Sequence, residues 1–422
     1  MPANQDYRFH QLSNGLRVVT ERLPQALSVS FGFWVEAGSR HEDPSQEGMA
    51  HLWEHMAFKG TDRLSAQDIA KALDLMGGQS NAYTSREHTC FHARVTARHL
   101  PEALALMAEI LLRPKLDPSD LAKEKDVVLQ EIASVEEDPE EQLMDAFWQA
   151  VWPGGSLAHS ILGTPRSVES FEGQGLWDWR RSRYNPRNMM VAAAGAVDHD
   201  QFLQLMHELF PAQPQGEPAP VPEPGHYSPE TFLKRREAEQ NHVALAFPCS
   251  GAADEDRFTL SLLNTLLGGN MSSRLFQEVR ERRGLAYSVY SFANTLADRG
   301  ILQVCAAVDP ERTLELMHCL RDELGDMAGG GIAQSDLDHA RDHLLSLLAL
   351  SLEASEDRMS RLARNQLLFG RYLAPEETMA RFEAVTLDQV RTMAADILRP
   401  DRTAVGVLGP MIDPGWPEIL SS

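Results

Sequence analysis

Landmarks recur in the two halves of this chain at an almost constant distance. Ser119 and Ser335 each open a long helical pattern, and they lie 216 residues apart. Gly195 and Gly409 each end an apolar, strand-like run, and they lie 214 residues apart. A constant offset between separated landmarks is typical of a duplicated domain. The sequence therefore predicts two copies of one domain, each of about two hundred residues.

Each predicted copy mixes strand-like stretches with longer helical patterns. Residues 28–38, 91–97 and 302–308 show the two-residue period of strands. In residues 101–111 and 311–324 the apolar side chains recur at spacings of three and four, as in helices. Because groups of strands precede runs of helices, the pattern indicates an α+β class rather than a strictly alternating parallel fold. We expect two homologous α/β-sandwich domains.

A proline-rich run divides the chain near its middle. Residues 211–224 read PAQPQGEPAPVPEP and contain no aromatic residue. Such a run is extended and semi-rigid, so it joins neither a helix nor a central strand. A long surface loop is one interpretation, but the central position favours an interdomain linker. We therefore predict domains at 1–210 and 227–422, joined by a linker at 211–226.

Composition excludes several classes of protein. The chain has 422 residues, of which 43% are hydrophobic and 24% charged, as in ordinary globular proteins. The 39 Lys and Arg against 61 Asp and Glu leave a net charge of −22, which argues against a nucleic-acid partner. The acidic balance either keeps the protein soluble or mildly favours cationic substrates.

The cysteines and the N-terminal segment bear on the compartment. The four cysteines are widely scattered without a CxxC pair, which argues against a disulfide framework or a cysteine-based zinc site. The first residues show neither the apolar core of a signal peptide nor the character of a transit peptide. No apolar run is long enough to span a membrane, so we expect no membrane partner. The expected location is a reducing cytosol.

The segment HLWEH carries the strongest chemical signal. On a helix, His51 and His55 share one face about one turn apart, so they can offer two imidazole nitrogens to one zinc ion. Glu54 lies beside them and is placed to act as a general base toward a metal-activated water. The apolar neighbours Met49 and Met56 indicate that this helix is largely buried.

The helix that starts near Ser119 offers a third zinc ligand. Glu124 and Glu131 lie seven residues apart, which is two turns on one face. Val127 and Val128 lie between them, so this face is expected to be buried. A buried carboxylate needs a partner such as a metal or a metal-bound histidine. Spacing alone does not say which of the two glutamates is the ligand.

These motifs resemble those of the pitrilysin, or M16, family of zinc metallopeptidases. H-x-x-E-H is the motif of the inverted zinc peptidases. The closest likeness is to the short bacterial peptidases and to the β subunit of mitochondrial processing peptidase. The resemblance covers nearly the whole chain and rests on the segments NGLRVVTERLP, FWVEAGSRHE, GMAHLWEHMAFKGT, GGQSNAYTSREHT and GGNMSSRLFQEVRERRGLAYSVYS.

The resemblance implies roles for individual residues. His51, His55 and Glu131 would be the ligands of one Zn²⁺ per chain, and Glu54 would be the base. Glu124 would orient one of these ligands without binding the metal itself. The second half has lost the metal, because no H-x-x-E-H occurs after the proline-rich run.

Two further sets of residues are implied to hold the substrate. Arg280 and Tyr287 match the family's Arg/Tyr pair, which binds the peptide and stabilises the oxyanion. Without the resemblance, the favoured interpretation would be a packed strand aromatic for Tyr287 and a solvated helix charge for Arg280. The strand that carries Asn81, Ala82, Tyr83 and Thr84 would be an exposed edge that takes up an extended peptide, although an internal strand is the alternative.

The sequence thus predicts a zinc metalloendopeptidase that cleaves peptides held in extended form inside a closed chamber. By resemblance, one chain is one half of a clamshell, so we expect a homodimer in the bacterial cytoplasm. Two alternatives stay open: a presequence-processing peptidase subunit, and a non-catalytic core or scaffold subunit of the same fold. The intact metal motif argues against the scaffold. The intact Arg/Tyr pair and the lack of a targeting segment argue for a stand-alone bacterial enzyme.

Overall fold

A computed structural model describes residues 6–210, 216–218, 220 and 222–421. The chain forms two compact units, each built from three segments. Of the described residues, the first unit contains those within 6–133, 159–224 and 350–372, and the second contains those within 134–158, 225–349 and 373–421. The predicted linker 211–226 falls in part on residues 211–215, 219 and 221, which lie outside the described residues. The domain limits predicted from the sequence stay predictions.

The first unit is built on a six-stranded sheet. Its strand order is β1-β2-β6-β3-β5-β4. Strands β2 and β6 are parallel, and all other neighbours are antiparallel. The strands span Tyr7–Gln11 (β1), Arg17–Arg22 (β2), Ser28–Val35 (β3), Gln79–Thr84 (β4), Thr89–Thr96 (β5) and Met189–Gly195 (β6).

The second unit is built on a five-stranded sheet. Its order is β7-β11-β8-β10-β9, with β7 and β11 parallel and the other neighbours antiparallel. The strands span Thr231–Arg235 (β7), Asn241–Ser250 (β8), Ala286–Thr295 (β9), Arg299–Val308 (β10) and Ala404–Gly409 (β11).

The two sheets have the same topology, which confirms the predicted duplication. Five strands of the first sheet, in the order β2-β6-β3-β5-β4, correspond to the second sheet, β7-β11-β8-β10-β9. In both, the strand that comes first in the chain lies parallel to the strand that comes last. The last strands, β6 and β11, end at Gly195 and Gly409. The long helices α4 (Pro118–Glu137) and α11 (Gln334–Ser351) begin one residue before Ser119 and Ser335. The α+β class is likewise confirmed.

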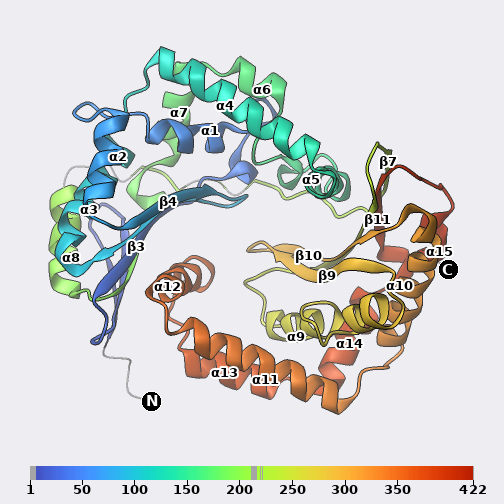
Figure 1. Ribbon diagram of the computed structural model, residues 1–422. Helices are drawn as coiled ribbons and strands as arrows, with labels where there is room; N and C mark the ends of the chain where they lie inside the picture. The colour runs from blue at the N-terminus through green and yellow to red at the C-terminus, as the bar shows by residue number, and fades with distance from the viewer. Residues whose placement is uncertain (1–5, 211–215, 219, 221, 422) are drawn as a thin grey trace. The chain divides into compact units, whose positions relative to one another are not determined.

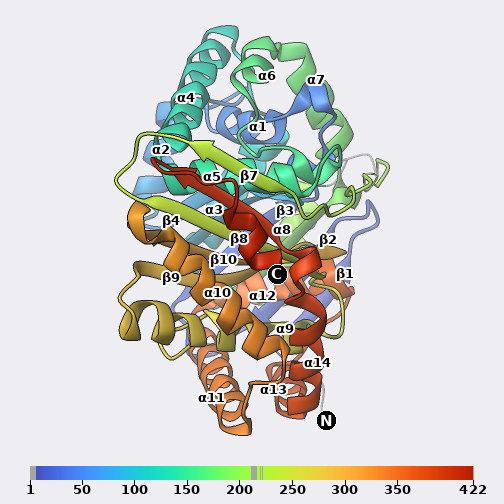
Figure 2. The same ribbon diagram turned by 90° about the vertical axis from the view of Figure 1, so that its right-hand side faces the viewer.

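One pair of equivalent helices is exchanged between the two halves of the sequence. Helix α5 (Pro139–Val151) belongs to the second unit and packs on β7, β8 and β11. Helix α12 (Ser355–Phe369) belongs to the first unit and packs on β2, β3 and β6. Figure 1 shows α12 beside the blue strands of the first unit, and Figure 2 shows α5 next to β7 and β11. The two helices begin 216 residues apart, so the duplication includes the exchange.

Helix α12 is held on its sheet by apolar contacts, to which an ion pair with a buried carboxylate adds. Met359, Leu362 and Ala363 are buried against a cluster that includes Trp34. Such burial stabilises by roughly 25 cal/mol for each Å² of apolar surface removed from water. The guanidinium group of Arg358 also pairs with Glu21 of β2 at 2.8 Å. Because Glu21 is buried, loss of Arg358 would leave an unpaired charge in the interior, which would destabilise the folded state.

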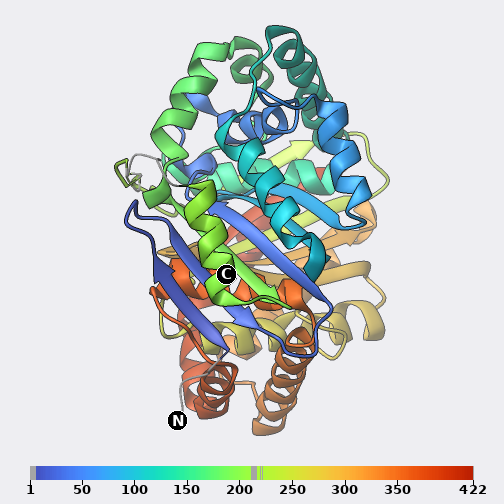
Figure 3. The same ribbon diagram turned by 90° about the vertical axis from the view of Figure 1, so that its left-hand side faces the viewer.

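The other face of the first sheet carries the larger core and the candidate site. Helices α1 (Met49–Ala57), α3 (Leu100–Leu112) and α8 (His199–Leu209) contact this sheet. Figure 3 shows α3 and α8 side by side across the strands. The remaining helices are α2 (Ala66–Leu75), α6 (Pro165–Ser170), α7 (Gly173–Arg183), α9 (Arg257–Leu267), a π-helix (Phe276–Arg282), α10 (Thr313–Ala328), α13 (Pro375–Ala384), α14 (Leu387–Ile397) and α15 (Trp416–Ser421). Among the described residues, none of the helices has the length and apolar character needed to cross a bilayer.

Candidate metal centre

Helix α1 presents the two histidines of the H-x-x-E-H motif on one face. Its N-cap, Gly48, has φ +89°, a left-handed conformation that favours glycine. Leu52, Trp53 and Met56 are buried and fix the opposite side of the helix in the core. His51 and His55 are therefore held one turn apart with ring centroids 4.6 Å apart. The sequence predicted a largely buried helix with both histidines on one face, and the structure has this helix.

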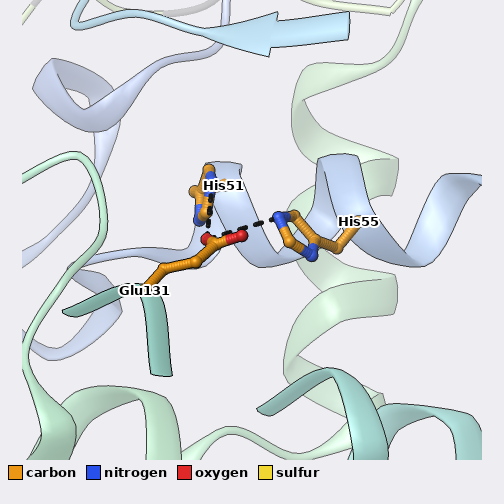
Figure 4. Close-up of side chains that lie close together, drawn as sticks. All are labelled: His51, His55 and Glu131. Atoms are coloured by element: carbon orange, nitrogen blue, oxygen red, sulfur yellow. Dashed lines mark ion pairs between the residues drawn. The ribbon is translucent and has the colours of Figure 1, made fainter. Parts of the chain in front are cut away.

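Glu131 of α4 faces both histidines. Its Oε2 atom lies 3.6 Å from His51 Nε2 and 3.6 Å from His55 Nε2. Figure 4 shows the carboxylate between the two rings. One possible ligand atom from each of the three residues lies within 4.8 Å of the others. Of the two glutamates that spacing left open, Glu131 is the one whose carboxylate reaches both imidazoles.

The arrangement fits a zinc ion. Tetrahedral zinc with bonds of about 2.0–2.2 Å separates its ligand atoms by roughly 3.3–3.6 Å, close to the two nitrogen–oxygen distances seen here. Those distances are too long for hydrogen bonds, so the three groups converge without bonding one another. Two imidazoles and one carboxylate are also the ligand types of catalytic zinc sites that keep an open position.

The protonation state of His51 supports the same conclusion. Burial, and secondarily the neighbouring His55, lowers the pKa of His51 to about 4. The imidazole is thus neutral near pH 7 and retains a lone pair for a metal. Its contact with Glu131 is therefore not an ion pair at neutral pH.

Glu124 contacts the back of one ligand. Its side chain is 7% exposed, and Oε2 lies 3.2 Å from His55 Nδ1. Its other oxygen, Oε1, lies 2.7 Å from Lys59 Nζ. This places Glu124 where an acid that orients a ligand would be. The expectation that the whole face between Glu124 and Glu131 is buried was wrong in part, because Val128 is buried but Val127 is 38% exposed. Val127 lies to one side of the buried stripe of α4.

Glu54 lies beside the histidines and carries no metal-ligand contact. Its Oε2 accepts a hydrogen bond of 2.6 Å from the hydroxyl of Thr84. Burial is the largest influence on its pKa and raises it; the Thr84 hydrogen bond and His55 lower it, and Glu131 raises it. A carboxyl group with a raised pKa near a metal centre is suited to accept a proton and release it.

The edge strand of the first sheet carries the four residues implied to bind a peptide. β4 is the last strand in the order, next to β5 only. Asn81, Ala82, Tyr83 and Thr84 form its C-terminal part, and their exposure alternates along the strand. Thr84 connects this edge to Glu54, and α1 itself contacts β4. An edge strand has backbone groups on one side with no strand partner.

Arg280 and Tyr287 lie in the second unit and contact each other. The guanidinium carbon of Arg280 is 4.7 Å from the ring centre of Tyr287 and 4.7 Å from that of Phe276. Tyr287 is 80% exposed, so it is not a packed core aromatic. Phe276 and Arg280 belong to a π-helix, a rare element that is frequent at functional sites. The half-buried guanidinium group of Arg280 thus stacks on two rings, of which that of Tyr287 is exposed.

Glu42 shapes the site and was missed by sequence reasoning. Glu42 is buried, and its Oε1 and Oε2 accept hydrogen bonds from the backbone N–H groups of Ala50 and Gly48 at 2.7 and 2.9 Å. Its carboxyl group therefore caps the N-terminus of α1 through these two N–H groups, while burial raises the pKa of Glu42 well above its usual range. The usual capping signal places the acceptor immediately before the helix, so a residue seven positions upstream gave no local pattern.

A duplicated α+β fold with an H-x-x-E-H helix facing a glutamate defines a two-domain protein with the metal-site pattern of the inverted zinc peptidases. Two family models match the chain: "Insulinase (Peptidase family M16)" over residues 17–165 and "Peptidase M16 inactive domain" over residues 170–344. The chain belongs to peptidase family M16. The second description agrees with the loss of the metal motif from the second half.

Curated relatives match over nearly their whole length. An uncharacterized zinc protease of Mycobacterium tuberculosis is 43% identical over 404 residues, which are 94% of this chain and 92% of that protein. The uncharacterized zinc protease YmxG of Bacillus subtilis is 35% identical over 388 residues, covering 92% of this chain and 95% of YmxG. A Rickettsia bellii zinc protease is 32% identical over 407 residues, covering 96% and 98%.

Two solved structures share the fold. A protease from Helicobacter pylori superposes with a TM-score of 0.89 at 22% identity, covering 96% of this chain and 99% of that one. A peptidase M16 inactive domain from Pseudomonas fluorescens superposes with a TM-score of 0.90 at 22% identity and the same coverage. At this identity the likeness shows the fold alone.

Proposed function

We propose that this protein is a zinc-dependent endopeptidase. The observation that carries the proposal is the convergence of His51, His55 and Glu131 on one point, with Glu54 beside them. The names of the curated relatives, which are zinc proteases, support it. The site holds one zinc ion per chain.

Each residue of the site has a distinct task in peptide hydrolysis. When bound, zinc supplies a Lewis acid that polarises the scissile carbonyl and lowers the pKa of a water molecule. His51, His55 and Glu131 hold the ion, and Glu124 fixes the ring of His55. Glu54 accepts the proton of the attacking water on its carboxylate and delivers it to the leaving amine. Thr84 keeps that carboxylate oriented.

The substrate is a peptide or unfolded segment held in extended form. The edge of β4 can pair with such a segment, because on that side no strand of the described residues pairs with its backbone N–H and C=O groups. Arg280 and Tyr287 bind the peptide and stabilise the oxyanion, the Arg with planar donors and the Tyr with its exposed hydroxyl. These roles rest on the family resemblance, on the exposure of Tyr287 and on its contact with the half-buried Arg280.

We also propose that two chains form a homodimer that encloses the substrate in a chamber. The chain carries both the metal motif and the Arg/Tyr pair, so no different subunit is needed to complete the set. A bacterial cytoplasmic location stays a prediction. A presequence-processing subunit is the second candidate, favoured only by the net charge of −22, which suits basic peptides. A non-catalytic core or scaffold subunit is disfavoured because every site residue is present.

The test combines metal analysis with cleavage of an unstructured peptide library. We expect the wild type to bind one zinc per chain and to cleave, chelation to abolish cleavage, and added zinc to restore it. Glu54→Gln should retain zinc and lose cleavage, whereas the exposed control Glu136→Gln should retain both. Equal cleavage by wild type and Glu54→Gln would overturn the mechanism. A wild type that binds zinc but cleaves no peptide would favour the scaffold.

A further inference from the structure

The carboxyl group of Glu124 has two partners, and the metal chemistry assigned above uses only one of them. Oε2 lies 3.2 Å from His55 Nδ1, and Oε1 lies 2.7 Å from Lys59 Nζ. Glu124 is 7% exposed at its side chain, whereas Lys59 is 34% exposed. The lysine therefore lies at the rim of the site, with its ammonium group directed inward at a buried carboxylate.

The local chain explains how Lys59 reaches this position. Helix α1 ends at Ala57, and the backbone N–H of Lys59 still bonds to the carbonyl oxygen of Met56 at 3.2 Å. This last turn keeps Lys59 four residues beyond His55 on a helix-like path, so both side chains project to the same side. One short segment thus supplies a metal ligand and the cation that contacts the carboxylate behind it.

A buried carboxylate that contacts only an imidazole would be poorly held. Each of its oxygens needs a partner to offset the loss of hydration. A carboxylate is also free to rotate unless both oxygens are bonded, and its rotation would turn Oε2 away from His55. The short contact between Lys59 and Oε1 fixes the plane of the group, because a charge-assisted hydrogen bond is stronger than a neutral one.

The balance of charges around the site also indicates a role for Lys59. Glu54, Glu124 and Glu131 bring three carboxylates to the neighbourhood of one ion. Within the described part of the chain, Lys59 is the only lysine or arginine that forms an ion pair with any of the three. One zinc ion and one lysine together balance three carboxylates, which lowers the cost of gathering these charges in a partly buried site.

We propose that Lys59 is a positioning residue of the zinc site, acting through Glu124 on His55. Its ammonium group holds Oε1, so that Oε2 accepts the Nδ1–H of His55 and Nε2 keeps its lone pair directed at the metal. The proposal deepens the proposed function and rests on zinc being the ion bound. Removing a group that supports a ligand in this way typically costs 10–100-fold in metal affinity.

The test measures zinc affinity by competition with a chromogenic chelator, a readout that needs no peptidase activity. We expect Lys59→Met, which keeps the apolar stem, to weaken zinc binding about tenfold. Lys59→Arg keeps the charge and the donors and should stay within about threefold of the wild type. The matched control is Lys123→Met on α4, beside Glu124 in sequence but 71% exposed and paired with Asp120, and it should leave affinity unchanged.

A double-variant cycle separates this effect from a general loss of stability. In a Glu124→Gln background, Lys59→Met should have little further effect, because the two residues act as one unit. Thermal unfolding of the metal-free variants checks that all are folded. Wild-type affinity in Lys59→Met, or equal losses in the presence and absence of Glu124, would overturn the role of Lys59. If the wild type binds zinc but cleaves no peptide, the proposed function fails while the affinity comparison still decides the role of Lys59.

Discussion

The hydroxyl of Thr84, at the end of edge strand β4, donates a 2.6 Å hydrogen bond to the carboxylate of Glu54 on α1. This bond connects the strand that we propose to bind the peptide with the residue that we propose to move its proton. The hydroxyl also lies 3.4 Å from that of Thr89 on the neighbouring strand β5. The position of the base is therefore coupled to the sheet and not only to its own helix.

Replacing Thr84 by valine should slow turnover while leaving the metal in place. Valine fills nearly the same volume but cannot donate, so Glu54 loses the contact that orients its carboxylate. We expect kcat to fall about tenfold, less than the roughly 10²–10⁴-fold of a whole general base, because Glu54 itself is still present, with zinc content unchanged. Steady-state kinetics on one peptide, with metal analysis of the same sample, gives both values. Thr84→Ser keeps the hydroxyl and should retain most of the activity; a valine variant with the wild-type kcat would contradict the prediction.

Glu42 allows a second prediction about the geometry of α1. Glu42→Ala removes the acceptors for the N–H groups of Gly48 and Ala50, so the first turn of the zinc helix loosens. The loss of a cap costs about 1–2 kcal/mol, and we also expect weaker zinc binding in the chelator competition. Asp138→Ala is the matched control, because Asp138 caps α5 of the second unit through the N–H groups of Glu140 and Glu141. The control should lose similar stability yet keep zinc affinity, and equal zinc affinity in both variants would refute a specific role of Glu42.

Some features of the fold and of the site could be predicted from the sequence, and others could not. The duplication, the H-x-x-E-H helix and the helix that carries Glu131 were predictable, because helical spacing and a constant offset are local or repeated signals. The exchange of α5 and α12 was not predictable, because the apolar face of a helix does not say which of two similar sheets it will cover. Lys59 and Glu42 were missed for a related reason. Their roles depend on contacts with Glu124 and with the backbone of α1, which no spacing in the sequence reveals.

The stack around Arg280 yields a prediction about substrate binding. Phe276 and Tyr287 hold the guanidinium group between two rings, an arrangement that a lysine or a smaller apolar residue cannot reproduce. We expect Phe276→Leu and Arg280→Lys each to raise KM several-fold. The first leaves a guanidinium group that must be ordered when the peptide binds, and the second removes the planar donors that hold the peptide. Zinc affinity should not change in either variant, since the stack and the histidines lie in different units. An unchanged KM in Phe276→Leu would show that the ring does not position Arg280.

His41, next to Glu42, gives the protein a predictable sensitivity to acid. The ring is buried, and its Nδ1 accepts a hydrogen bond from the backbone N–H of Gly38 at 3.2 Å, which requires the neutral imidazole. Burial, followed by the charges of Arg183, Arg40 and His88, lowers the pKa of His41 to about 4. Since the unfolded chain has a value near 6.5, it binds the proton more readily than the folded chain. The stabilising contribution is therefore fully present above pH 6.5 and is lost as the pH falls toward 4.

The comparison with His41→Gln isolates this effect, because all other histidines titrate in both proteins. We expect the variant to be less stable than the wild type near pH 7.5, and the difference in unfolding free energy to shrink by about 2 kcal/mol near pH 5. Urea unfolding at the two pH values, followed by the same spectroscopic signal, measures the difference directly. A gap that stays constant between the two pH values would mean that His41 does not titrate with a lowered pKa. Acid loss of stability would then have to come from another buried group, of which His51 in the metal centre is the first to test, by adding zinc.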